Sequence, residues 1–171
     1  MTKESINFLK FNNPTQGELL FSQVLAEIVK FMGADANARY TLMIGSDSTG
    51  YDELDIVSVV AVHRVGNGGR YFWYRQGKSG IHTLRQKIYA EVQASLELAA
   101  IFLPAFRDSI KQAEGLSEMP FDFQIHVDVG TVGPTRDLVH EVTGMVTGYG
   151  YDVLVKPLSA AATSLADKHV K

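Results

Sequence analysis

The N-terminal part of the chain contains one amphipathic segment. Apolar residues recur at helical spacing between Leu19 and Met32, and Gly33 follows the last of them. Thr15, with Glu18 three residues later, matches the pattern of a helix N-cap. The spacing predicts a helix over residues 16–32, outside the catalytic part of the chain. Such a helix would cover one face of a sheet or form a contact in a homodimer.

Three apolar runs follow this helix with short polar connections between them. Residues 40–47, 55–64 and 70–76 are rich in β-branched or aromatic side chains, which is typical of strands. A polar turn containing Gly50 separates the first two runs, and Gly66–Gly69 separates the second and third. The pattern predicts a three-stranded antiparallel meander.

The second half of the chain alternates helices with strands. A helix is predicted over 81–106, with Pro104 perturbing its end, and further helices over 135–147 and 160–170. Strands are predicted over 121–127 and 151–155. The whole pattern predicts an α/β fold with a mixed five-stranded sheet. Residues 1–39 form an N-terminal extension with the amphipathic helix, and residues 40–171 form the main domain.

Composition narrows the class of protein. A chain of 171 residues, 46% of them hydrophobic, has the size of one α/β domain. The absence of cysteine excludes disulfides, thiolate catalysis and Cys-based metal sites, and is typical of a cytoplasmic protein. No signal peptide or run long enough to span a bilayer is evident, so no membrane partner is expected. With a net charge of -3, any nucleic-acid surface must be locally basic.

Four acidic residues occupy positions that predict a metal site. Asp47 and Asp128 end apolar strands, Glu91 lies in the long helix and Asp167 in the last one. A carboxylate at the end of a buried strand is costly unless something pairs with it. Several converging carboxylates are most simply explained by a divalent cation, and Mg²⁺ or Mn²⁺ prefers such oxygen ligands.

Each acid also has a simpler interpretation when taken alone. Asp47 could cap a turn, Glu91 could be a solvated helix residue, and Asp167 could be a surface charge near the chain end. Glu97 is an alternative to Glu91 on the same helix, but six residues turn a helix by roughly 240°, so the two cannot share a face. Glu91 is preferred because Ala90 and its apolar neighbours mark the side that faces the sheet.

Two histidines lie close in sequence to these acids. His126 precedes Asp128 by two residues and therefore shares its face in a strand. It could lie near the metals or be a buried histidine bonded to backbone. His169 follows Asp167 by two residues, which in a helix places it off the face of the acid, so a structural role is favoured over an accessory one.

Basic and aromatic residues alternate in the segment that follows the meander turn. Such interleaving suits a groove that tracks a nucleic-acid backbone and stacks bases, and it equally suits a strand with one aromatic and one solvated face. Gly130–Arg136 precedes a predicted helix and could bind a phosphate at its N-terminus, although it lacks the signature of a P-loop. The candidate substrate-binding residues are Arg75, Lys78, Arg85, Lys87 and Arg136.

Several short motifs accompany this order of elements. They are IGSDS at 44–48, IHVDVG at 125–130, GPT at 133–135, GYG at 148–150, and KPLS at 156–159 followed by SLAD at 164–167. On these motifs, residues 40–171 resemble the YkuK-type family of ribonuclease H-like bacterial proteins. One departure is Ser48-Thr49-Gly50 after the first acid, where relatives are expected to carry a bulkier polar residue.

The resemblance implies a fold and, through it, a chemistry. In the ribonuclease H fold the first strand, first core helix, fourth strand and last helix each contribute an acid, here Asp47, Glu91, Asp128 and Asp167. The expected function is a nuclease with two divalent ions roughly 4 Å apart, which hydrolyses RNA, an RNA–DNA hybrid or structured DNA. Asp47 would bridge the ions, with Glu91 and Asp128 completing one shell and Asp167 the other. The alternative is a non-catalytic module that binds nucleic acid or a protein.

Overall fold

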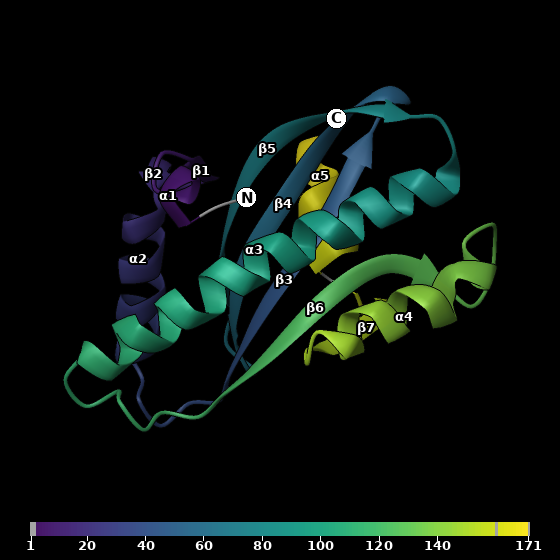
Figure 1. Ribbon diagram of the computed structural model, residues 1–171. Helices are drawn as coiled ribbons and strands as arrows, with labels where there is room; N and C mark the ends of the chain where they lie inside the picture. Colours follow the sequence, from purple (N-terminus) through teal and green to yellow (C-terminus); the bar gives the residue numbers. More distant parts are fainter. Residues whose placement is uncertain (1–2, 160, 171) are drawn as a thin grey trace.

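A twisted mixed sheet runs through the protein in the computed structural model, which describes residues 3–159 and 161–170 (Figure 1). Among these residues the sheet has seven strands. Their spatial order is β2 (Gly17–Leu20), β1 (Lys10–Asn13), β5 (Gly69–Ile81), β4 (Asp52–Arg64), β3 (Tyr40–Thr49), β6 (Phe121–Gly130) and β7 (Asp152–Lys156).

The predicted antiparallel meander is confirmed. β3 pairs with β4 along its whole length, from Tyr40 opposite Arg64 to Thr49 opposite Asp55. β4 pairs with β5 in the same sense, and β6 and β7 join the other side of β3 in parallel. This α/β order, with β3 at the junction between the two halves, agrees with the fold expected from the resemblance. β3 therefore presents its C-terminal end to both halves of the molecule.

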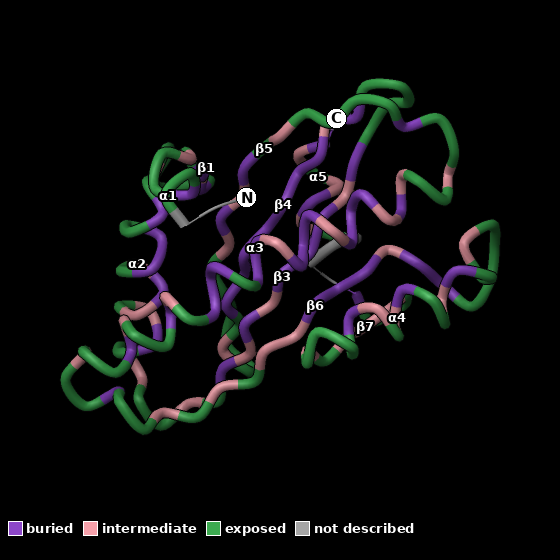
Figure 2. The backbone as a smooth tube through the Cα atoms, viewed as in Figure 1, coloured by how far each residue is buried: buried purple, intermediate pink, exposed green. Residues whose placement is uncertain are grey.

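Helices cover the two faces of the sheet very unequally. One face carries α2 (Phe21–Gly33), α3 (Leu84–Gln112) and α4 (Val139–Gly148), which share the large hydrophobic core with the strands. Of the elements in the described residues, the other face carries the short π-helix η2 (Ala161–Ala166) and α5 (Asp167–Val170), seen behind the sheet in Figure 1. Figure 2 shows the buried backbone concentrated along the central strands and the sheet-facing side of α3.

The prediction of five strands is wrong, because the N-terminal segment adds a hairpin to the sheet. β1 pairs with β2, and β1 also joins β5 at Asn12 opposite Trp73. Gly17 takes a left-handed conformation (φ 74°), and the Asn13 side chain accepts hydrogen bonds from the backbone N–H groups of Thr15 and Gln16. The residues before Tyr40, expected to be an extension, thus contribute two strands and α1 (Lys3–Ile6).

This hairpin also displaces the start of the predicted helix over residues 16–32. α2 begins at Phe21, where the Gln23 side chain accepts a hydrogen bond from the Leu20 N–H. Thr15 and Glu18 are not its cap, because Glu18 lies in β2 and pairs with Lys10 at 2.8 Å. The apolar residues Leu19 and Leu20, which fit the helical spacing, belong to β2.

α3 is longer than its prediction over residues 81–106 and does not end at Pro104. Thr83 caps its start, with Thr83 Oγ1 accepting from Gln86 N and Gln86 Oε1 accepting from Thr83 N. Pro104 is exposed, and the helix continues to Gln112. Among the described helices α3 alone has the length and composition to cross a bilayer, and 67% of its most apolar window is buried inside the protein. Its place in the core accounts for that apolar character.

The last two helices also differ from their predictions. The helix predicted over residues 135–147 starts as a 3₁₀ turn, η1 (Arg136–Leu138), before α4. The helix predicted over residues 160–170 winds as η2 before α5, while residue 160 lies outside the described residues. Burial of Ala166 and Val170 against β4 fixes the register of this segment, and an Ala-rich sequence alone does not specify the wider π winding.

Candidate active site

β3 and β6 separate at their C-terminal ends. Their pairing runs from Tyr40 opposite Phe121 to Gly45 opposite His126 and then stops, although β3 continues beside β4 to Thr49. Asp47 and Asp128 each lie two residues beyond the last pair. The two acids therefore flank a split at the carboxyl ends of two parallel strands, where open α/β sheets commonly bind their ligands.

Glu91 reaches this split from α3. It is 4% exposed, and its Oε1 accepts a hydrogen bond of 2.7 Å from Ser48 Oγ. One turn further along α3, Ser95 Oγ donates to Ser46 Oγ at 2.9 Å, and Ser46 Oγ lies 2.8 Å from Ser58 Oγ. These buried hydroxyls set the register of α3 on β3 and so place Glu91.

Sequence reasoning missed this hydroxyl cluster, although a signal for it was present. Ser46 and Ser48 alternate along an apolar strand, and Glu91 and Ser95 are four residues apart on an apolar helix. A two-residue step on a strand matched to a four-residue step on a helix brings two pairs of side chains together.

Burial raises the pKa of Glu91 from its ordinary value of 4.5 to about 8. The hydrogen bond from Ser48 and the charge of Lys87 act in the opposite direction, while the charges of Asp47 and Asp128 raise the pKa further. In the absence of a cation Glu91 is therefore mostly neutral at pH 7. A divalent ion would favour its charged form.

The pKa of Asp47 depends on burial and on the charges of neighbouring residues. Burial raises its pKa, a hydrogen bond of 2.9 Å from Ser48 N to Oδ1 lowers it, and the charges of Asp128 and Asp167 raise it again. The charge of Lys87 lowers it. The four predicted acids thus belong to one electrostatic cluster, with Asp47 coupled to the other three.

Asp128 is engaged by a lysine. Its Oδ1 is buried and lies 2.8 Å from Lys156 Nζ, in an ion pair whose angles are not those of a hydrogen bond. Lys156 ends β7 opposite Gly130. Within residues 3–159 and 161–170, no three His, Asp or Glu side chains are grouped so as to hold a metal ion. The cluster contains the donors that a divalent ion prefers, but the described residues do not group them as a closed metal site.

His126 lies beneath the acids on the same face of β6 as Asp128. It is 2% exposed, its Nε2 is 3.3 Å from Gln124 Oε1, and burial lowers its pKa to about 4. A neutral, enclosed ring of this kind packs within the fold next to the strand end that carries Asp128.

His169 clamps α5 onto the meander. Its ring stacks on Trp73 with 4.2 Å between ring centroids, and its Nε2 lies 3.3 Å from Tyr71 Oη. Its backbone carbonyl accepts a hydrogen bond from Arg75. Tyr71, Trp73 and Arg75 alternate along β5 and so face α5 together. This contact holds the segment that carries Asp167.

The five candidate substrate-binding residues are dispersed. Arg75 pairs with Asp55, Arg85 with Glu141 and Arg136 with Asp137. Lys78 lines a small cavity between β5 and α3, beside Glu97. Lys87 lies 5.8 Å from the Tyr51 ring centroid, and its charge acts on Asp47 and Glu91. Of these five residues, Lys87 is the one that belongs to the acidic cluster.

The sequence model of the ribonuclease H-like family matches residues 23–171. The chain belongs to the ribonuclease H-like family. It is also 31% identical over 172 residues to the uncharacterised protein YkuK of Bacillus subtilis strain 168, covering 94% of this chain and 96% of that protein. The YkuK-type resemblance is therefore confirmed. No solved structure shows a significant match. Membership of this ribonuclease H-like family suggests a nuclease-type or nucleic-acid-binding function.

Proposed function

We propose that this protein is a divalent-metal-dependent nuclease that hydrolyses phosphodiester bonds in RNA, an RNA–DNA hybrid or structured DNA. The observation that carries the proposal is the cluster of Asp47, Glu91, Asp128 and Asp167 at the split between β3 and β6. Burial and mutual repulsion make this cluster costly in the absence of a cation.

The donor set fits Mg²⁺ or Mn²⁺, because both ions prefer carboxylate oxygens. Asp47, coupled to all three other acids, is the candidate bridging ligand, with Glu91 and Asp128 on one side and Asp167 on the other. When bound, a pair of ions would activate water and stabilise the leaving oxygen. Closing the site requires Lys156 to release Asp128 and Glu91 to lose its proton.

The remaining residues of the cluster position the acids and the substrate. Ser48 orients the Glu91 carboxylate through its 2.7 Å hydrogen bond. Lys87 offsets part of the negative charge, and Lys156, once free of Asp128, is placed to bind a phosphate oxygen. These two lysines allow a polyanionic substrate to approach four carboxylates.

The test is cleavage of labelled RNA, RNA–DNA hybrid, single-stranded DNA and four-way junction DNA with Mg²⁺ or Mn²⁺. Asp128→Asn should abolish cleavage. Asp122→Asn, on the same strand but at the opposite end of the pairing with β3, should not. Calorimetric titration of Mn²⁺ should give binding to the parent protein that Asp128→Asn weakens. A parent protein that neither cuts any substrate nor binds Mn²⁺ would overturn the proposal.

A non-catalytic nucleic-acid-binding module is the alternative, and one observation favours it. Lys156 already neutralises Asp128, and Glu91 is mostly neutral at pH 7, so the cluster has a metal-free arrangement of its own. Under this alternative the substrates bind equally well to the parent protein and to Asp128→Asn, and neither protein cuts them.

A further inference from the structure

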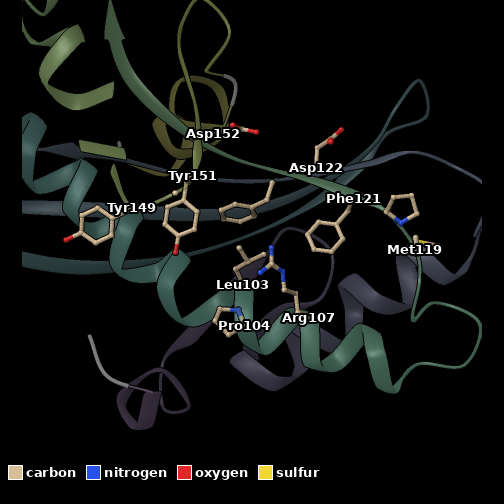
Figure 3. Close-up of a pocket in the computed structure, with 12 residues that line it drawn as sticks. Leu103, Pro104, Arg107, Met119, Phe121, Asp122, Tyr149, Tyr151 and Asp152 are labelled. Carbon is tan, nitrogen blue, oxygen red and sulfur yellow. The ribbon is translucent and has the colours of Figure 1, made fainter. Parts of the chain in front are cut away.

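A groove of about 680 Å³ lies far from the acidic cluster, between the C-terminal half of α3, the start of β6 and the turn from α4 to β7 (Figure 3). Its lining includes Pro104, Arg107, Phe121, Phe123, Tyr149 and Tyr151. Phe123 and Tyr151 form an edge-to-face pair at 5.5 Å, and Phe121 packs edge-on against Phe106 at 5.1 Å. The floor of the groove is therefore a row of ordered rings.

Strand alternation separates the charges around this groove. Phe123 shares the α3-facing side of β6 with Ile125, whereas Asp122 faces the other side of the sheet and approaches Arg39 at 4.0 Å. Asp152 lies opposite Gln124 and therefore also faces away. Figure 3 shows both carboxylates pointing away from the rings and Arg107. Arg107 is thus the charged group on the ring side of the groove, and Asp122 and Asp152 line its opposite rim.

Arg107 supplies the positive charge on the ring side of the groove. It is exposed, and within the described part of the chain it forms no ion pair with a carboxylate. Its charge acts on the phenol of Tyr151, lowering a pKa that burial raises. Five other arginines, Arg39, Arg64, Arg75, Arg85 and Arg136, each have a carboxylate within 4.0 Å. A guanidinium left unpaired beside aromatic rings is available to an anionic ligand.

Tyr149 extends the row of rings into solvent on a rigid support. Its side chain is among the most exposed large hydrophobic groups, at 61%. The end of α4 fixes its backbone, because Tyr149 N and Gly150 N donate to Val146 O and Thr147 O. Gly150 adopts φ 85°, the left-handed conformation that ends a helix. The exposed ring is therefore held ready for stacking.

We propose that this groove binds single-stranded nucleic acid, with bases stacking on Tyr149 and Tyr151 and a backbone phosphate bound by Arg107. Stacking suits any base, because every base has a flat π-face, and the guanidinium supplies the backbone contact. The inference rests on the proposed function, since it gives the substrate a single-stranded region that lies outside the cleavage site.

The spacing along α3 predicts how long that region must be. Arg107 follows Glu91 by 16 residues on one helix, a separation of roughly 24 Å at the usual helical rise. A strand with the rise of duplex DNA would cover that separation with about seven nucleotides. Oligonucleotides much shorter than this can occupy the groove or the acidic cluster but not both.

The test is fluorescence anisotropy with labelled single-stranded RNA and DNA of about four and about sixteen nucleotides, in EDTA so that no cleavage occurs. We expect Tyr149→Ala and Arg107→Ala each to weaken binding of the longer oligonucleotide roughly tenfold. Tyr149→Phe keeps the ring and should bind like the parent protein. Lys30→Ala removes a cation of α2 that lies outside the groove and should also leave affinity unchanged.

The outcomes separate this inference from the proposed nuclease. Loss of affinity in the two alanine variants, with both controls unchanged, supports the groove even if no cleavage is ever detected. Equal affinity in all four variants, or no binding of either oligonucleotide, overturns the groove even if the acidic cluster cuts nucleic acid. Binding of an acidic peptide through Tyr149 and Arg107, with no oligonucleotide binding, would assign the groove to a protein partner and also overturn the inference.

Discussion

Replacing Glu91 by Gln should remove most of the pH dependence of the protein's stability between mildly acidic and mildly alkaline solution. The pKa of Glu91 rises from 4.5 to about 8 on folding, mainly through burial. Because the folded state binds this proton more tightly than the unfolded state, stability is greatest below pH 4.5 as far as Glu91 is concerned. It falls as pH rises through 8.

The size of this pH effect on stability follows from the pKa shift of Glu91. At about 1.4 kcal/mol per pKa unit, the free energy of unfolding of the parent protein should fall by roughly 5 kcal/mol between those two pH values. A glutamine keeps the shape of the protonated acid and a carbonyl that can accept from Ser48 Oγ. Glu91→Gln should therefore match the parent protein near pH 5 and exceed its stability by several kcal/mol at pH 9.

Urea unfolding in EDTA, followed by circular dichroism at several pH values, measures this difference. Glu97→Gln is the matched control, since Glu97 lies on the same helix and bonds to Gln93 rather than to the acidic cluster. Addition of Mn²⁺ should recover part of the loss at pH 9 in the parent protein but not in Glu91→Gln. Parallel pH profiles for the parent protein and Glu91→Gln would refute the reasoning.

Three further predictions concern the supports of the site. His169→Ala should free α5 from Trp73, the single tryptophan. Acrylamide should then quench the tryptophan fluorescence more strongly, while the unfolding midpoint in urea changes little. Unchanged quenching would show that the stack does not hold α5. Ser48→Ala leaves Glu91 without its donor and should cost about 1–3 kcal/mol in urea unfolding, and a cost no larger than that of Thr49→Ala would contradict the role of this bond. Lys156→Gln removes the cation beside Asp128 and should tighten Mn²⁺ binding measured by calorimetry, whereas Lys168→Gln should not.

The sequence predicted the parts of the fold that depend on periodicity and turn chemistry. The meander, the long helix and the two parallel strands carry clear apolar spacing. Asp47 and Asp128 were predicted from the ends of two apolar runs, and Glu91 from its apolar neighbours on the long helix. The β1–β2 hairpin escaped because its strands have four residues each, too few for alternation to stand out beside the helical pattern that follows.

What the sequence could not provide depends on contacts between distant segments. Asp128 pairs with Lys156, which lies 28 residues later in the chain. His169 stacks on Trp73, which lies in β5 and is far from it in the sequence. No spacing rule connects these residues, since tertiary packing alone brings them together. The basic residues between Arg70 and Lys87 likewise do not form one surface. In the folded protein Arg75 on the strand and Arg85 and Lys87 on the helix contact separate partners.

The early end of pairing between β3 and β6 has a consequence for water. Backbone N–H and C=O groups that leave a ladder must find other partners, and beside this split Ser48 N donates to Asp47 Oδ1. Backbone groups without a ladder partner bind water, unlike those of the paired strands beneath them. Mg²⁺ gives up its water shell reluctantly and usually keeps several waters when bound. A split bordered by Asp47, Asp128 and backbone groups that have left the ladder would suit an ion that keeps part of that shell.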